Sequence, residues 1–234
     1  MIVLLAHGSR DARHREGIER LAAQVAIVAP DDNVGHAYFD FHGPDLATAV
    51  SAAERGETVL VLPLLMSAGV HLREDVPAAV RSAQSDRHDL VWRLLAPLPV
   101  SRLATVVTQY LRAQDVAVRR ELVLVPAGST RAGALTGIDD LARGLAASRS
   151  VGVRVANGVD DLALSRRPSA GPGEAWLPVM YADGRLLDSL RRRATGCGAE
   201  VLPPLGSLPG VAVEIASWLA ADLAEPEDSS RSPG

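Results

Sequence analysis

The sequence predicts an α/β protein of two tandem, homologous half-domains, each a parallel sheet flanked by helices, with an active-site cleft between them. Aliphatic runs of strand length alternate with segments of helical periodicity through the first half of the chain. The same alternation then begins again. "ELVLVPAGSTRAG" resembles "IVLLAHGSRDAR", and "AWLPVMYADGRLLDSL" resembles "LVLPLLMSAGVHLREDV".

The first strand is expected at residues 2–6, a continuous aliphatic run typical of a strand buried on both faces. A helix should follow, capped by Ser9 or Asp11, because Ile18, Leu21 and Val25 recur at helical spacing. Further strands are predicted within residues 33–41, 57–65 and 89–97, and further helices at 46–54, 77–85 and 100–113.

The repeat suggests half-domains at residues 1–115 and 116–224, followed by a disordered tail at 225–234 rich in Pro, Ser and charge. Residues 165–175, rich in Pro, Gly, Ser and Arg, are expected to form a mobile loop. The second copy lacks two histidines of the first. Ala127 stands where the first copy has His7, and the position matching His71 falls near Leu186.

The overall composition excludes several classes of protein. A formal net charge of −4 gives no general basic field for nucleic acid. The only cysteine, Cys197, excludes an internal disulfide framework and fits a reducing cytoplasm. No apolar run approaches the ~20 residues that cross a bilayer, and "MIVLLA" is too short for a signal peptide. Every basic residue is Arg, so any anion would be bound by guanidinium groups.

His7 and His71 each follow a buried strand and a small-residue turn. Ligands of open parallel sheets bind beyond the carboxyl ends of the strands, and a neutral imidazole can bind a divalent metal or accept a proton. Each histidine could instead only hydrogen-bond a turn. Their joint loss from the second copy favours one shared site. The remaining histidines show no spacing that ties them to this pair.

Other residues flank the pair. Asp40 ends the second strand, where it could take a proton, help to bind a metal or simply cap a turn. The role of Glu74 is left open between the site and the helix dipole. Ser9 and Gly69 lie in turns that can approach a ligand closely. Flanking arginines would meet an anionic ligand first, unless they only solvate helix faces; these are Arg10, Arg13 and Arg73.

With "AHGSRDAR", "AYFDFHGPDL" and "LPLLMSAGVHLREDVPAA", the chain resembles the sirohydrochlorin chelatases, the class II chelatases, in their long two-domain form. The resemblance implies insertion of Fe²⁺ or Co²⁺ into sirohydrochlorin, in siroheme or cobalamin biosynthesis. It assigns the metal-handling and catalytic roles to His7 and His71. Asp40 stands where many members have Glu, which keeps a carboxylate with a shorter reach. The arginines would hold the carboxylates of the macrocycle.

The resemblance also implies which molecules the protein binds. The divalent metal (Fe²⁺, Co²⁺ or Ni²⁺) is a substrate, no prosthetic group is expected, and neither are nucleic acid or membrane partners. A monomer is expected, because a tandem duplication can replace a dimer of single halves. One alternative is a non-catalytic tetrapyrrole or metal carrier. A histidine phosphatase is a remote one, since that chemistry needs Arg directly before the nucleophilic His and this chain has Ala6.

Overall fold

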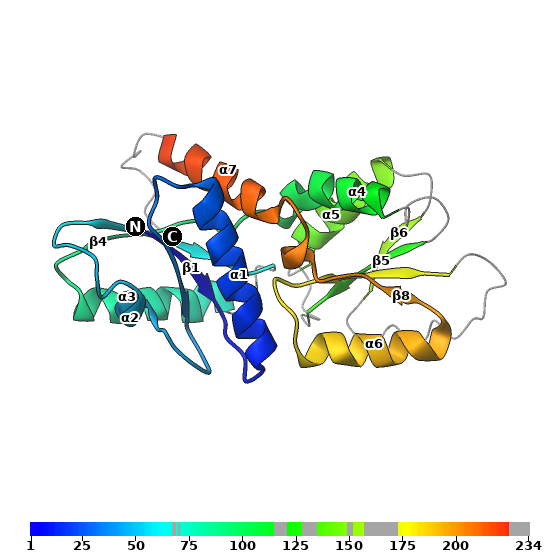
Figure 1. The fold of residues 1–234 in the computed structure, drawn as a ribbon, viewed down its shortest axis with the longest axis horizontal. Helices are drawn as coiled ribbons and strands as arrows, with labels where there is room; N and C mark the ends of the chain where they lie inside the picture. The colour runs from blue at the N-terminus through cyan, green and yellow to red at the C-terminus, as the bar shows by residue number, and fades with distance from the viewer. Residues whose placement is uncertain are drawn as a thin grey trace.

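The computed structural model describes residues 1–66, 69, 71–114, 121–127, 135–148, 152–156 and 173–224. It contains two four-stranded parallel sheets with the same strand order, β2-β1-β3-β4 and β6-β5-β7-β8 (Figure 1). The strands of the first sheet are β1 (Ile2–Ala6), β2 (Val34–Tyr38), β3 (Thr58–Pro63) and β4 (Val91–Leu94). Those of the second are β5 (Leu122–Pro126), β6 (Val153–Val155), β7 (Ala175–Val179) and β8 (Glu200–Val201). The predicted fold class, with its internal repeat, is confirmed.

The α-helices are α1 (Ala12–Val28), α2 (Leu46–Ala49), α3 (Val76–Asp86), α4 (Ala104–Ala113), α5 (Thr136–Ala147), α6 (Arg185–Cys197) and α7 (Val211–Ala224). A π-helical turn, His71–Asp75, precedes α3, and a 3₁₀ turn, Val100–Leu103, precedes α4. Asp11 caps α1 as expected, accepting a hydrogen bond from the backbone N–H of Arg13.

The helix predicted at 46–54 is shorter than expected, because α2 ends at Ala49. Arg87 supplies the physical reason. Its guanidinium donates hydrogen bonds to the carbonyl oxygens of Val50, at 2.6 Å, and Ala53, at 2.9 Å. Backbone bonds of the i→i+3 type, from Ser51 N–H to Thr48 and from Ala53 N–H to Val50, also replace the helical ladder here, and the segment turns toward β3.

Each sheet buries its two faces differently. One face of the first sheet lies under α2 and α3, where Val50 and Val80 join a cluster separate from the second half. One face of the second sheet lies under α6 in the same way. The other two faces belong to a single apolar cluster that runs through both halves, from Leu4 and Ile18 to Leu124 and Leu219. The halves therefore share one core.

The helices that close this shared core are exchanged between the halves. Helix α7, from the end of the chain, packs beside α1 over the first half, and α4 packs beside α5 over the second (Figure 1). Ion pairs tie α7 to the first half, with Arg93–Asp222 at 2.7 Å and Arg102–Glu214 at 2.6 Å. The indole N–H of Trp218 also donates to the Ala96 carbonyl at 3.1 Å.

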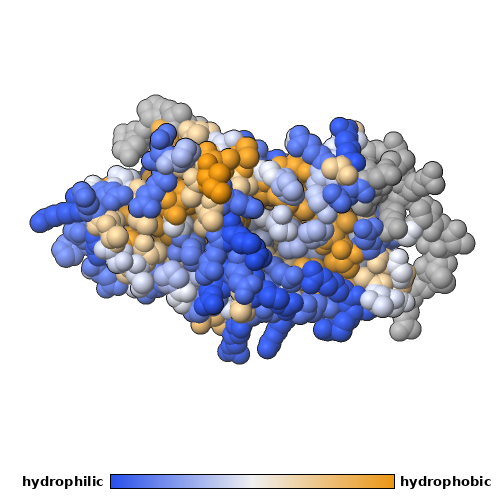
Figure 2. All heavy atoms as spheres, viewed as in Figure 1, coloured by the Kyte–Doolittle hydropathy of each residue, from blue (hydrophilic) through white to orange (hydrophobic). Residues whose placement is uncertain are grey.

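Helix α1 contacts the second half on its other side. A Cβ atom at Gly17 would lie 2.6 Å from the Cβ of Ala182, so only glycine permits this approach of α1 to the segment after β7. Arg13 donates to both carboxylate oxygens of Asp188 in α6, at 2.9 and 2.6 Å. Figure 2 shows a hydrophilic surface over α1, whereas hydrophobic residues gather over α7.

Three expectations are not tested by these contacts. The division at residue 115 remains a prediction about the sequence repeat, since packing exchanges helices across it. Most of the loop predicted at 165–175, and the tail at 225–234, lie outside the described residues. Within the described ranges, no helix has the length and apolar character needed to cross a bilayer.

The contact at Gly17 yields a stability prediction. Gly17→Ala should lower the free energy of unfolding by about 1–3 kcal/mol, as overpacking does, because the new methyl group meets Ala182. Gly196→Ala in α6 is the matched control. No heavy atom lies within 4 Å of its Cβ position, so alanine should raise stability by up to about 1 kcal/mol. Urea unfolding followed by circular dichroism measures both; a stabilised Gly17→Ala variant would contradict the contact.

Candidate functional site

The strand order places the candidate site. Strands β1 and β3 are neighbours, and the connection from β1 runs to β2 on one side of the pair, whereas the connection from β3 runs to β4 on the other. The crevice beyond the carboxyl ends of such strands is where open α/β sheets bind ligands. His7 directly follows β1, and His71 opens the π-helical turn that follows β3. The predicted pair therefore stands at the switch point of the first sheet.

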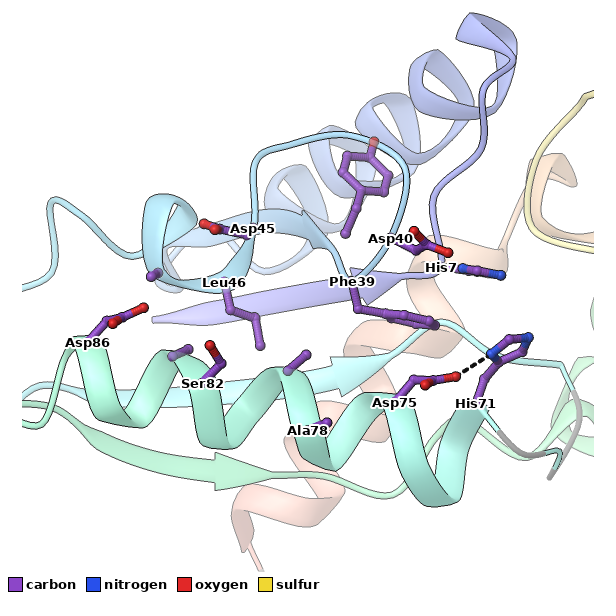
Figure 3. A pocket seen from close by; sticks show the side chains of 14 residues that line it. His7, Phe39, Asp40, Asp45, Leu46, His71, Asp75, Ala78, Ser82 and Asp86 are labelled. Carbon is purple, nitrogen blue, oxygen red and sulfur yellow. Dashed lines mark hydrogen bonds and ion pairs between the residues drawn. The ribbon is translucent and has the colours of Figure 1, made fainter.

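The two imidazoles lie together. Their ring centroids are 4.4 Å apart, with 44° between the planes. His7 also stacks on Phe39, at 4.9 Å and 6°, and contacts the tilted ring of Phe41 at 5.4 Å. These are the two phenylalanines of the chain. The contacts with these two aromatic rings restrict the rotation of the His7 side chain. Figure 3 shows His7 beside Phe39 and His71.

A carboxylate orients His71. Its Nδ1 lies 2.6 Å from Oδ2 of Asp75, one helical turn along the same segment (Figure 3). Both side chains are about half exposed, 51% and 48%, so the pair contributes little to stability. Its effect is on chemistry. A hydrogen bond from Nδ1–H to a carboxylate fixes the tautomer and leaves the Nε2 lone pair free.

Gly8 explains the close approach of Asp40 to His7. Its φ of +95° lies in the left-handed region, and a Cβ atom there would stand 2.1 Å from the Asp40 carbonyl oxygen. The Asp40 N–H donates to the His7 carbonyl oxygen at 3.0 Å. The glycine after His7 therefore serves backbone contact between two strand ends. The Asp40 carboxylate itself accepts the N–H of Phe41 at 2.7 Å.

Two cavities meet at the histidine pair. The first is a groove of about 400 Å³ along α3, which Figure 3 shows running from His71 toward Asp86. Its lining includes four carboxylates, those of Asp40, Asp45, Asp75 and Asp86. This negative lining attracts cations and repels anions.

The second cavity, of about 590 Å³, lies between the halves. His7 and His71 line it from one side, and Ala127 and Leu186, their counterparts in the sequence repeat, line it from the other. Its walls are mostly apolar, including Ile18, Leu64, Met66, Leu135 and Met180. The switch points of both sheets therefore open into this cavity, and that of the first sheet carries the two imidazoles.

The predicted substrate-binding residues divide into two groups. Ser9 and Gly69 line the cavity between the halves. Arg10, Arg13 and Arg73 are not among the described lining residues of either cavity. The guanidinium of Arg10 lies over the ring of Phe41, at 5.5 Å from its centroid.

The other two arginines differ in their surroundings. The guanidinium of Arg13 is bound by the carboxylates of Asp11 and Asp188, which holds the pKa of Asp11 at about 2. Arg73 is exposed. From the second half, Arg185 contributes a guanidinium that lines the cavity. The roles predicted for the three arginines remain predictions.

Metal ligation by Asp40 also remains a prediction. Among the residues that the structure describes, no group of three or more His, Cys, Asp or Glu side chains gathers closely enough to hold a metal ion. Glu74 is exposed on the π-helical turn, and its role is also untested.

Sequence reasoning missed four polar residues in the cavity between the halves, His14, Tyr181, Asp183 and Arg185. His14 lies one helical turn before Ile18 on the buried face of α1, and that spacing was the available signal. Tyr181 follows β7 and is 6% exposed. Its hydroxyl, and Nδ1 of both His7 and His14, are buried without a hydrogen-bond partner in the described part of the chain. Burial raises the pKa of Tyr181.

Comparison with known proteins agrees with this arrangement. SirB from Bacillus subtilis, solved with Fe³⁺, superposes with a TM-score of 0.76 at 16% identity, over 95% of each chain. CbiX, described as the terminal enzyme of siroheme biosynthesis in denitrifying bacteria, gives a TM-score of 0.71 at 24% identity, over 94% of this chain and 98% of that one. The chain therefore has the same fold as these two proteins.

The sequence comparisons match the first half of the chain. The CbiX family model matches residues 1–113. The sirohydrochlorin cobaltochelatase of Methanopyrus kandleri is 32% identical over 78 residues, which is 32% of this chain and 54% of that protein. The chain thus matches about half the length of this relative. The segment matched by the CbiX model includes both histidines.

The His71–Asp75 contact predicts a tautomer. When its imidazole is neutral, His71 should carry its proton on Nδ1, because the Nδ1–H group can then donate a hydrogen bond to Oδ2 of Asp75. Asp75→Ala should give a mixture with the Nε2–H form. Long-range ¹H–¹⁵N NMR of the histidine rings distinguishes the two. Asp86→Ala, in the same groove, is the control and should leave the His71 signals unchanged. An Nε2–H tautomer in the unaltered protein would refute the assignment.

Proposed function

We propose that the protein inserts a divalent metal ion into sirohydrochlorin. The observation that carries this proposal is the pair of imidazoles, 4.4 Å apart between centroids, where an acidic groove meets an apolar cavity. The names of the relatives point to the same reaction. A cation and a large planar ligand can reach the pair from different sides.

The residues of the site suit the steps of this reaction. His71, oriented by Asp75, presents its Nε2 lone pair to an incoming ion. His7, held between aromatic rings, offers a second nitrogen, and two imidazoles leave coordination positions open for the macrocycle. Apolar walls would pack on the faces of the ring system, with Arg185 near its carboxylates. As the metal enters, the pyrrole nitrogens release protons, and imidazoles can accept them.

Iron is the metal we favour, with cobalt as the alternative, because every organism that makes siroheme needs ferrous insertion. Imidazole affinity rises from Fe²⁺ through Co²⁺ to Ni²⁺, so the ligand set alone does not select iron. Anaerobic insertion assays with Fe²⁺ and Co²⁺ at equal concentration measure the preference. A kcat/KM for Co²⁺ more than tenfold above that for Fe²⁺ would move the assignment to cobalamin biosynthesis.

We also make a proposal for the oligomeric state and the location of the enzyme in the cell. We expect a monomer in the cytoplasm, since the two halves already share one core and the single cysteine suits a reducing compartment. Light scattering that gives the mass of a dimer would contradict the first expectation. A non-catalytic carrier is the competing function, and it predicts binding of the macrocycle with no acceleration of metal insertion.

The histidine pair provides the test. His7→Ala and His71→Ala should each lower kcat for insertion by at least about 100-fold, the lower end of a general acid–base contribution, with loss of metal affinity in addition. The absorbance of the macrocycle reports turnover. His88→Ala is the control, since His88 is exposed and lines neither cavity among their described residues. Insertion by the unaltered protein at the spontaneous rate would leave the carrier as the function.

A further inference from the structure

The cavity between the halves contains a third imidazole, that of His14 on α1. Its Nδ1 is buried and has no hydrogen-bond partner among the described residues. Buried polar atoms without partners are uncommon in folded proteins, and each calls for an explanation. His14 nevertheless lines the space where the macrocycle would lie, and because its Nδ1 is buried, Nε2 is the ring nitrogen that a ligand there could reach.

His14 stands apart from the metal-handling pair. The described ring contacts of His7 are with Phe39, Phe41 and His71, whereas His14 contacts Tyr38, at 6.5 Å between centroids. No group of three potential ligands forms among the described residues, so His14 does not join His7 and His71 around one ion. It is a histidine of the same cavity with no share in the metal site.

The surroundings of His14 keep it neutral. Burial lowers its pKa below 6.5, and nearby His42 and His7 lower it further, while the Asp11 carboxylate acts in the opposite direction. On the side of the second half, the cavity also contains Tyr181, Asp183 and Arg185. Near neutral pH the imidazole is uncharged and therefore has a free lone pair.

Metal insertion requires such a group. Two pyrrole N–H bonds break, their electron pairs form bonds to the metal, and two protons must leave. While the nitrogens of His7 and His71 hold the ion, their lone pairs are occupied, so these two imidazoles can accept a proton only after the ion has passed to the macrocycle. We infer that His14 is a catalytic base of the cavity, which accepts a pyrrole proton on its imidazole and passes it to solvent as the product forms. This inference rests on the proposed function.

The test compares two partly buried histidines. In His14→Gln, kcat at pH 7.5 should fall by about 100-fold, as expected for loss of a general base. The difference from the unaltered protein should shrink as the pH falls below 6.5, because protonated His14 cannot accept a proton. Binding of metal-free sirohydrochlorin, followed by its fluorescence, should stay within about twofold. A merely structural role would not produce this pH dependence.

His36→Gln is the matched control. Burial lowers the pKa of His36 too, but it lies on β2 beside Glu19 and is absent from the described lining of both cavities. Its kcat and pH profile should equal those of the unaltered protein. An active parent with a normal kcat in His14→Gln overturns the role of His14 alone, as does a loss confined to macrocycle binding. An inactive parent overturns the proposed function as well.

Discussion

The inner face of each sheet can be buried only with helices from both halves, and this shared apolar core determines the rest of the molecule. Helix α1 covers the first sheet and touches α7 and the segment after β7 of the second half. Burial of apolar surface, at about 25 cal/mol per Å², therefore fixes the position of one half against the other. The cavity between the halves, whose shape depends on that position, is a product of core packing.

The ends of the strands that face the cavity have the same topology in both halves, but they carry different side chains. The first supplies His7 and His71, and the second supplies Ala127 and Leu186 at the corresponding places. The charges are also divided. Carboxylates line the groove along α3, whereas the larger cavity is mostly apolar. The two imidazoles thus lie where an acidic groove meets a mostly apolar cavity.

Much of this could be predicted from sequence because the signals are local. Buried strands such as Ile2–Ala6 and Leu122–Pro126 are continuous aliphatic runs, and parallel strands bring the residues that follow them to one edge. The proximity of His7 and His71 follows from that rule and the strand order. The truncation of α2 depends on Arg87, which is far along the chain from that helix, and so no local pattern could reveal it.

The features that the sequence did not reveal are of two kinds. The binding of Arg13 to Asp188 joins residues 175 positions apart, so a flanking arginine looked free when it is engaged by the other half. His14, in contrast, had a local signal. It falls on the apolar stripe of α1 with Ile18, although its charged sequence neighbours suggested a solvated face. Helical periodicity was the better guide than composition.

The exchanged helices also bear on how the chain is made. Helix α1 packs against α7 (Val211–Ala224). The inner face of the first sheet is therefore fully covered only after this last described helix has been synthesised. During synthesis at about 5–20 residues per second, that face stays open for roughly ten seconds or more after β1 and α1 have left the ribosome. Contacts of such long sequence separation slow folding. The nascent N-terminal half is therefore the species most in need of chaperone protection.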